Sequence, residues 1–235
     1  VIEKSGEIIP QVIRVLVEKR DGALPETVFP TACPVCGTDL IRLAGEVAWR
    51  CPSETCPKKI KEWILHFSGR RMMKIEGLGD ALVDQLVDRG LVNNPADLYR
   101  LELGQVAELD RMAKKSASNL IEQIEQSKQA GLAKLIYALG IRHVGEHTGK
   151  VLAGHFGDLD KLAAATPEEL SNIFEIGGVV AQSVADWFRY PANQALVEEL
   201  KAVGVVTQSE QAQSDVPQIF AGKQFVLTGT LATLS

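Results

Sequence analysis

The chain has 235 residues and a formal net charge of −5, with 46% hydrophobic and 23% charged residues. This composition is typical of a globular protein of one or two domains and excludes a disordered chain. No apolar stretch approaches the roughly 20 residues that a membrane-spanning helix needs, and no basic-then-apolar signal segment opens the sequence. We therefore expect a cytoplasmic protein that has no membrane partner.

The charge is distributed unevenly along the chain. Residues 1–57 carry 6 basic and 8 acidic groups, residues 58–150 carry 15 and 12, and residues 151–235 carry 4 and 10. A small basic excess in the middle segment is compatible with DNA binding, because backbone N–H groups contact phosphates as well as lysine and arginine do. The overall charge by itself does not indicate nucleic acid.

Residues 1–29 begin the chain with a β-branched apolar run at 12–17, which predicts a buried strand. We interpret the segment as the last part of a β-barrel. Lys19-Arg20-Asp21-Gly22 matches K-x-D-G, the adenylation motif of nucleotidyltransferases. Such a lysine needs a large nucleotide-binding domain around it, and only ten residues separate Gly22 from the next module. We therefore expect a charged turn here.

All four cysteines occur in the spacing C-x2-C-x14-C-x4-C, as Cys33, Cys36, Cys51 and Cys56. Two knuckles of this kind can present four thiolates tetrahedrally to Zn²⁺. Iron and two disulfides are the alternatives, and disulfides are rare in cytosolic proteins. The set needs no histidine or carboxylate to complete it. Residues 30–57 are therefore predicted to hold a closed, structural zinc site.

Residues 58–206 contain a pattern that recurs four times. Each copy has an anchor residue with an apolar residue before it and a small or apolar residue four positions later. The anchors are Gly79, Ala113, Gly145 and Gly177, separated by 34, 32 and 32 residues. A fixed period in this range is the signature of a repeated supersecondary unit. The pattern resembles the helix-hairpin-helix, a module that binds the DNA backbone without reading sequence, so we expect a mainly α, multidomain fold.

The turns of the first three hairpins are the predicted DNA contacts. Glycine lets a backbone approach a ligand closely, and the N-terminus of a helix favours phosphate. The candidate residues are Arg70, Gly77, Gly79, Arg111, Lys114, Lys115, Arg142, Gly145 and Lys150. His143 is expected to be a surface residue. Glu175 would repel a phosphate, so the fourth hairpin is expected mainly to pack against the third.

The order of these segments resembles bacterial NAD-dependent DNA ligases. The resemblance rests on Gly6-Glu7-Ile8-Ile9-Pro10, the four cysteines, Glu76-Gly77-Leu78-Gly79, and Tyr137-Ala138-Leu139-Gly140-Ile141-Arg142 with Val144-Gly145. It implies that residues 1–29 end an OB-fold, that the polar residues 207–217 are a linker, and that residues 218–235 begin a BRCT domain. Ala113, where glycine is usual, and Lys74, where an acidic residue is common, depart from the pattern.

The resemblance also implies a function. A protein of this family joins 5′-phosphate and 3′-hydroxyl ends at nicks in duplex DNA during replication and repair, with NAD⁺ and Mg²⁺. Its catalytic residues precede this region, so we expect no catalysis from these residues alone. We expect instead a monomeric clamp on nicked duplex, independent of sequence, in the bacterial cytoplasm at the nucleoid. Two alternatives stay open: a non-catalytic helix-hairpin-helix repair protein, and a zinc-ribbon interaction protein.

Overall fold

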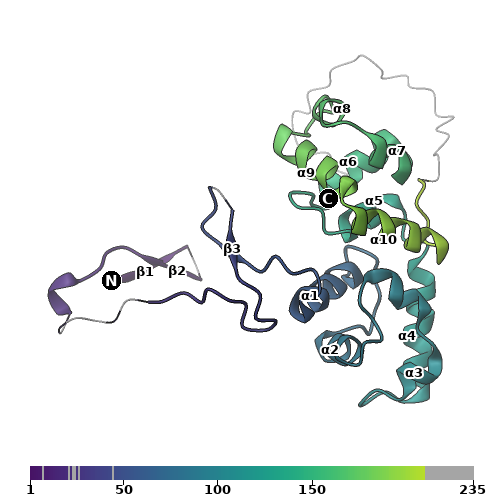
Figure 1. The fold of residues 1–235 in the computed structure, drawn as a ribbon, viewed down its shortest axis with the longest axis horizontal. Helices are drawn as coiled ribbons and strands as arrows, with labels where there is room; N and C mark the ends of the chain where they lie inside the picture. The colour runs from purple at the N-terminus through teal and green to yellow at the C-terminus, as the bar shows by residue number, and fades with distance from the viewer. Residues whose placement is uncertain (7, 21, 23–24, 26, 44, 210–235) are drawn as a thin grey trace, which may run out of the picture. The chain divides into compact units, whose positions relative to one another are not determined.

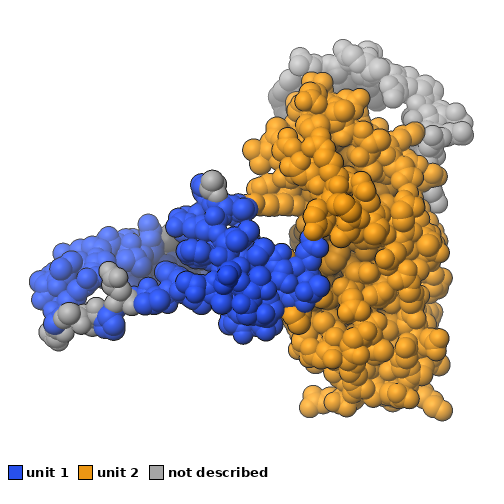
Figure 2. Space-filling model, viewed as in Figure 1, with its two compact units in different colours: residues 1–56 blue, residues 57–235 orange. Residues whose placement is uncertain are grey.

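The computed structural model describes residues 1–209 except 7, 21, 23–24, 26 and 44. The chain divides into two compact units, residues 1–56 and residues 57–235 (Figure 2). The predicted BRCT segment, and the predicted linker from residue 210 onward, lie outside the described residues. No helix in the described part is long and apolar enough to cross a membrane.

Unit 1 contains two short antiparallel strand pairs. Strand β1 (Ile2–Ser5) pairs with β2 (Ile9–Val12), and β3 (Ile41–Arg42) pairs with β4 (Trp49–Arg50). A 3₁₀ turn, η1 (Val17–Lys19), follows the first pair and places Lys19 at its end.

The prediction of a buried strand over residues 12–17 is wrong. The strand ends at Val12, and Val12, Val15 and Val17 are all exposed. β-branched residues favour a pleated surface only where neighbouring strands cover their side chains. Among the described residues, β2 is paired with β1 alone, so that cover is missing.

Unit 2 is helical, and the mainly α fold is confirmed. Its elements in chain order are α1 (Pro57–Ser68), α2 (Asp80–Asp88), η2 (Pro95–Arg100), α3 (Leu103–Ala107), α4 (Lys114–Ser127), α5 (Leu132–Ala138), α6 (Glu146–Phe156), α7 (Leu159–Ala164), α8 (Pro167–Ser171), α9 (Gly178–Arg189) and α10 (Pro191–Ala202).

These elements form four hairpins, α1–α2, α3–α4, α5–α6 and α8–α9, with each pair of helices in contact (Figure 1). The short helices η2 and α7 connect the first hairpin to the second and the third to the fourth. Helix α10 packs on α9 and on η2, so it joins the two halves of the unit. Unit 2 is therefore two tandem pairs of hairpins with one continuous core.

The core confirms the repeat that the sequence predicts. In every hairpin the residue before the anchor and the residue four positions after it are buried or half-buried: Leu78, Val83, Met112, Ala117, Val144, Gly149, Ile176 and Ala181. The NH of each residue in the second set donates to the anchor carbonyl at 2.9–3.0 Å. Fully burying one large apolar side chain contributes about 1.5–3 kcal/mol, so Leu78, Val144 and Ile176 help to stabilise their hairpins.

Helix α5 is fixed to the helices on both of its sides. His66 Nε2 of α1 lies 2.9 Å from the carbonyl oxygen of Tyr137, and the two rings meet edge to face. On the other side, α6 approaches so closely that a Cβ at Gly149 would lie 2.9 Å from the Ala133 carbonyl oxygen. Only glycine allows this approach, and it sets the relative position of α1, α5 and α6.

The sequence Asn94-Pro95 predicts that a helix starts near Ala96, because asparagine is a favoured N-cap and proline a favoured first helical residue. Asn94 caps it as predicted, since its side chain accepts from the NH groups of Ala96 and Asp97. The six residues that follow form the 3₁₀ helix η2 instead of an α-helix. Such short pieces of 3₁₀ helix are common as connectors.

Candidate metal centre and nucleic-acid interface

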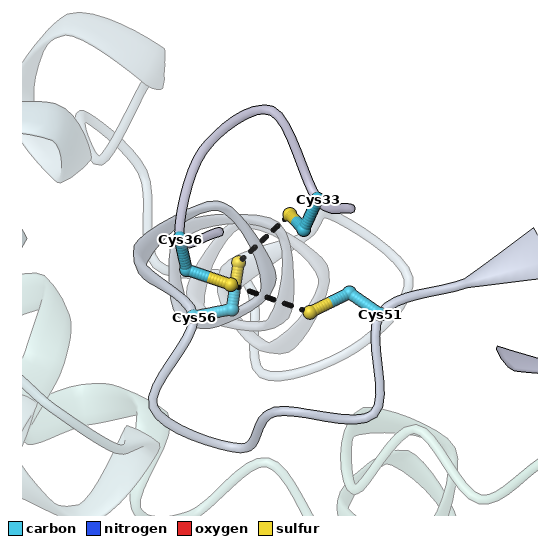
Figure 3. Close-up of side chains that lie close together, drawn as sticks. All are labelled: Cys33, Cys36, Cys51 and Cys56. Atoms are coloured by element: carbon cyan, nitrogen blue, oxygen red, sulfur yellow. Dashed lines mark hydrogen bonds between the residues drawn. The ribbon is translucent and has the colours of Figure 1, made fainter. Parts of the chain in front are cut away.

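The four cysteines of unit 1 form one cluster, in which the sulfur atoms point toward a common centre (Figure 3). The four Sγ atoms lie within 4.8 Å of one another, with Cys36 and Cys51 at 3.4 Å and Cys33 and Cys56 at 4.0 Å. Tetrahedral zinc with Zn–S bonds of about 2.3 Å separates its sulfur ligands by about 3.8 Å. These distances fit a tetrahedral thiolate site and are too long for disulfide bonds.

The first knuckle is a tight turn that brings Cys33 and Cys36 to the same side. Gly37 has a φ of +73° and donates its NH to the Cys33 carbonyl at 2.9 Å, while the Cys33 NH donates to the Thr38 carbonyl at 2.8 Å. Positive φ is easily adopted by glycine. This local geometry explains why the C-x2-C spacing followed by glycine builds half of the cluster.

The thiols of the two knuckles differ in acidity. Hydrogen bonding by Thr38, whose Oγ1 lies 3.3 Å from Cys36 Sγ, lowers the pKa of Cys36 to about 6. Burial, together with the neighbouring Cys36, raises the pKa of Cys51 to about 11. A bound divalent cation deprotonates the thiols that ligate it. All four cysteines would therefore bind a cation as thiolates.

In unit 2, the second helix of every hairpin begins immediately after its anchor. The anchors Gly79, Ala113, Gly145 and Gly177 are the N-cap residues of α2, α4, α6 and α9, and all four have extended backbone angles. Ala113, which departs from the glycine pattern, has φ −95° and ψ 162°, close to Gly79 at −96° and 176°. Alanine at the second anchor therefore has the same backbone conformation as glycine at the first.

The N-termini of these four helices have no side-chain cap. At each anchor no side chain accepts a hydrogen bond from the first turn, whereas Asn94, Asp158 and Thr166 cap η2, α7 and α8. The first backbone N–H groups of a helix have no intrahelical partner. Helices α5 and α10 also begin without a side-chain cap. A missing cap therefore indicates a candidate phosphate site only where it coincides with an exposed anchor at a hairpin turn.

A second shared feature lies two residues before each anchor. Gly77, Arg111, His143 and Glu175 all have positive φ, at 92°, 64°, 66° and 72°. In the last three hairpins the turn is closed by an i→i+3 backbone hydrogen bond of 3.0 Å. Positive φ at the third residue of such a turn is typical of type II turns, which prefer glycine there. At this position, three of the four hairpins therefore hold a non-glycine residue in a conformation that costs free energy. In the first hairpin, Lys74 has a positive φ of 54° three residues earlier.

The predicted DNA-binding residues lie at the surface of these turns. Arg70, Arg111, Lys114, Lys115, Arg142 and Lys150 are exposed, as are Gly77, Gly79 and Gly145. His143 is exposed as predicted and lies beside Arg142 on the third turn. The structure brings Arg70 and Lys150, which are 80 residues apart in sequence, to the walls of one pocket. None of the other predicted DNA-binding residues lines this pocket.

The fourth turn has a different surface. Glu175 Oε2 lies 2.6 Å from His147 Nε2 of α6, so its carboxylate is directed at the third hairpin. Phe174 is 86% exposed and Val179 is 68% exposed. The corresponding residues of the other turns are polar, charged or small: Glu76 and Ala81, Asp110 and Lys115, Arg142 and His147. The backbone of the repeat is kept while its outer surface has changed.

Comparison with known proteins agrees with both units. Residues 32–57 match the NAD-dependent DNA ligase C4 zinc finger domain, residues 69–126 match the SAM-like helix-hairpin-helix tandem, and residues 134–197 match a helix-hairpin-helix motif. The DNA ligase of Heliobacterium modesticaldum is 52% identical over 235 residues, which are 100% of this chain and 35% of that protein. The chain belongs to the DNA ligase family.

Two further DNA ligases are similar over nearly the whole chain. That of Carboxydothermus hydrogenoformans is 49% identical over 234 residues, covering 100% of this chain and 35% of the relative. That of Prosthecochloris aestuarii is 49% identical over 232 residues, covering 98% and 34%. The chain thus spans about a third of the length of these relatives.

Sequence reasoning missed two features of this DNA ligase segment. The positive-φ position could have been found from the sequence. When the four anchors are aligned, Gly77 of the first copy occupies the same position as Arg111, His143 and Glu175, and glycine is the residue that favours positive φ. No local sequence pattern predicts that Arg71, Lys134 and Lys150 line the same pocket. Their proximity depends on how α1, α5 and α6 pack.

Proposed function

We propose that residues 57–209 grip the backbone of duplex DNA through the turns of the first three hairpins. The observation that carries this proposal is the set of uncapped helix N-termini at exposed anchors. Unpaired N–H groups and the helix dipole favour a phosphate at such a terminus. Backbone contacts of this kind fix position without reading bases, so the binding is independent of sequence.

The neighbouring cations support the same surface. Arg111, Lys114 and Lys115 are exposed around the second turn, and Arg142 lies on the third. No acidic residue occupies the first turn of α4. Each phosphate neutralised by lysine or arginine is expected to steepen the salt dependence by about 0.9 units of log K per log salt.

We propose that Cys33, Cys36, Cys51 and Cys56 ligate one structural Zn²⁺. The domain match and the mutual Sγ distances support a four-thiolate site. A catalytic zinc keeps an open coordination position, whereas four cysteines fill all four. The ion would hold the two knuckles of residues 31–57 together and take no part in chemistry.

For the whole protein, we propose the joining of 5′-phosphate and 3′-hydroxyl ends at nicks in duplex DNA, with NAD⁺ as the adenylate donor and Mg²⁺. The match to the NAD-dependent ligase zinc finger domain supports this activity. Within the segment, Lys19 closes an exposed 3₁₀ turn of unit 1, which is a poor site for adenylation. We expect the segment alone to clamp DNA without forming an adenylate or sealing a nick.

The test of DNA binding compares two substitutions at equivalent anchors. At both Gly79 and Gly177 an added Cβ would meet no atom within 4 Å, and neither has positive φ. Aspartate is a favoured N-cap, so Gly79→Asp and Gly177→Asp should both fold, with a stability change of only a few tenths of a kcal/mol. In Gly79→Asp the new carboxylate would accept from the N–H groups that a phosphate needs.

Fluorescence anisotropy with a labelled nicked duplex at two salt concentrations gives the readout. We expect Gly79→Asp to weaken binding by about tenfold, on the scale of one hydrogen bond to a charged group. Gly177→Asp should change it less than twofold, because the fourth turn already carries Glu175. Equal losses, or a greater loss at Gly177, would show that the DNA-facing turns are assigned wrongly, and the absence of any binding would refute the clamp.

A further inference from the structure

A basic pocket lies between the first and third hairpins of unit 2. Its volume is about 520 Å³, and its walls carry Arg70, Arg71, Lys134 and Lys150, with Ala133 and Tyr137 between them. A single carboxylate, Glu146, also lines it. Four cations from three segments of the chain therefore surround one anion.

Glu146 pairs directly with two of these cations. Its Oε1 accepts from Lys150 Nζ at 2.8 Å, and its Oε2 lies 3.9 Å from Arg71 Nη1. Lys150, Arg71 and Lys134 together lower the pKa of Glu146. The carboxylate is thus ionised and contacts the same groups that bind phosphate oxygens elsewhere.

The pocket adjoins the uncapped terminus of the third hairpin. Glu146 is the first residue of α6, directly after the anchor Gly145. Arg70 and Arg71 belong to the segment that leads from α1 to the first turn. An anion in this pocket would therefore contact both hairpins at once.

The helices that carry the pocket are held together before any ligand binds. Tyr137 is held to α1 through His66, and Ala133 is held to α6 by the close approach at Gly149. Helix α5, which carries Lys134, is in contact with both α1 and α6. A site that is already arranged loses less entropy when it binds.

We propose that this basic pocket binds one phosphodiester group of duplex DNA, and that the carboxylate of Glu146 takes the place of that phosphate in the free protein. This inference rests on the proposed DNA clamp and adds a contact that joins its first and third hairpins. On DNA binding, the phosphate replaces Glu146 as the partner of Arg71 and Lys150. Glu146 thereby lowers the affinity of the clamp, because its ion pairs must be exchanged.

The test uses anisotropy titrations of the whole chain with a labelled duplex at several salt concentrations. Glu146→Gln should bind DNA about three- to tenfold more tightly at low salt, since an amide competes poorly for the cations. Arg71→Ala combined with Lys150→Ala, which removes both cations that contact Glu146, should weaken binding about tenfold and reduce the salt slope by about one. In that double background, Glu146→Gln should lose most of its effect, because contacting residues are not additive.

Two matched variants control for charge alone. Lys161→Ala removes an exposed lysine of α7, and Glu168→Gln removes an exposed carboxylate from the first turn of α8, both outside the pocket. Both should leave the affinity within about twofold. If wild-type protein binds DNA and Gly79→Asp weakens it, but the pocket variants behave like these controls, the pocket inference is refuted and the clamp stands.

A last arm separates DNA from a free phosphate. Inorganic phosphate, added at constant ionic strength, should displace the duplex only weakly, because the pocket supplies one of several contacts. Displacement at micromolar phosphate that is lost in the Arg71→Ala and Lys150→Ala background would assign the pocket to a free anion instead, and would overturn the proposal.

Discussion

Unit 1 and unit 2 are stabilised by different means. Among the described residues of unit 1 the buried apolar side chains are Cys33 and Cys56, while Val28 and Val47 are 87% and 84% exposed. Unit 2 has a continuous apolar core from Ile64 to Val205. Burial of apolar surface is the main favourable term in folding, so unit 1 has little of it. We therefore expect the knuckles of unit 1 to depend on the proposed zinc ion, and the hairpins of unit 2 to fold without it.

Removal of the metal should give the largest effect. Structural zinc contributes about 10–16 kcal/mol of binding free energy in small zinc domains, and that free energy is also folding free energy. Treatment with a strong chelator, or Cys51→Ser, should therefore disorder residues 31–57. The helices of unit 2 should keep their melting temperature and their affinity for DNA.

Elemental analysis and hydrogen exchange measure the two halves of this prediction. We expect one zinc per chain before treatment and fast exchange confined to unit 1 afterwards. Loss of helical circular dichroism on chelation would show that the metal also supports unit 2, and that the two units do not differ in their dependence on it. Protein purified under reducing conditions without zinc would refute the metal assignment itself.

The core of unit 2 should respond to a single methyl group. Gly149→Ala places a Cβ 2.9 Å from the Ala133 carbonyl oxygen, so α5 and α6 must separate. We expect a loss of about 1–3 kcal/mol in the free energy of unfolding. Gly154 lies on the same helix, exposed, with no atom within 4 Å of an added Cβ. Gly154→Ala should stabilise by about 0.5–1 kcal/mol, because alanine is the better helix former.

Thermal or urea unfolding of the two variants provides the comparison. Zinc content should stay at the wild-type value in both, since the change lies in unit 2. Two variants that were equally stabilised would show that α5 and α6 adjust without cost, and the close packing at Gly149 would then have no energetic role.

The sequence was sufficient for the parts of the fold that depend on local pattern. The anchor spacing located the second helix of each hairpin, and the cysteine spacing located the cluster, because both depend on short-range geometry. The strand expected at 12–17 failed for lack of neighbours, since β-branched composition says nothing about what covers a strand. The pocket also escaped prediction, because Arg71 and Lys134 meet only through the tertiary contact between α1 and α5.

The smallest expected effect tests the four turns against one another. Arg111 has φ +64°, and the equivalent Gly77 has φ +92°. A left-handed conformation costs a non-glycine residue roughly 1–2 kcal/mol, while glycine loses about 0.5–1 kcal/mol more entropy on folding than alanine. Arg111→Gly should therefore stabilise unit 2 by about 0.5–1 kcal/mol and weaken DNA binding, because a cation is lost from the second turn.

Gly77→Ala, the reverse change in the first turn, should destabilise unit 2 by a similar amount. Its Cβ would meet only Leu120 Cδ1 at 3.9 Å, so the backbone strain alone acts there. Urea titrations and anisotropy measured on the same preparations decide the matter. If Arg111→Gly gained stability without losing affinity, the arginine would have no binding role to balance its strain, and the second turn would leave the proposed DNA surface.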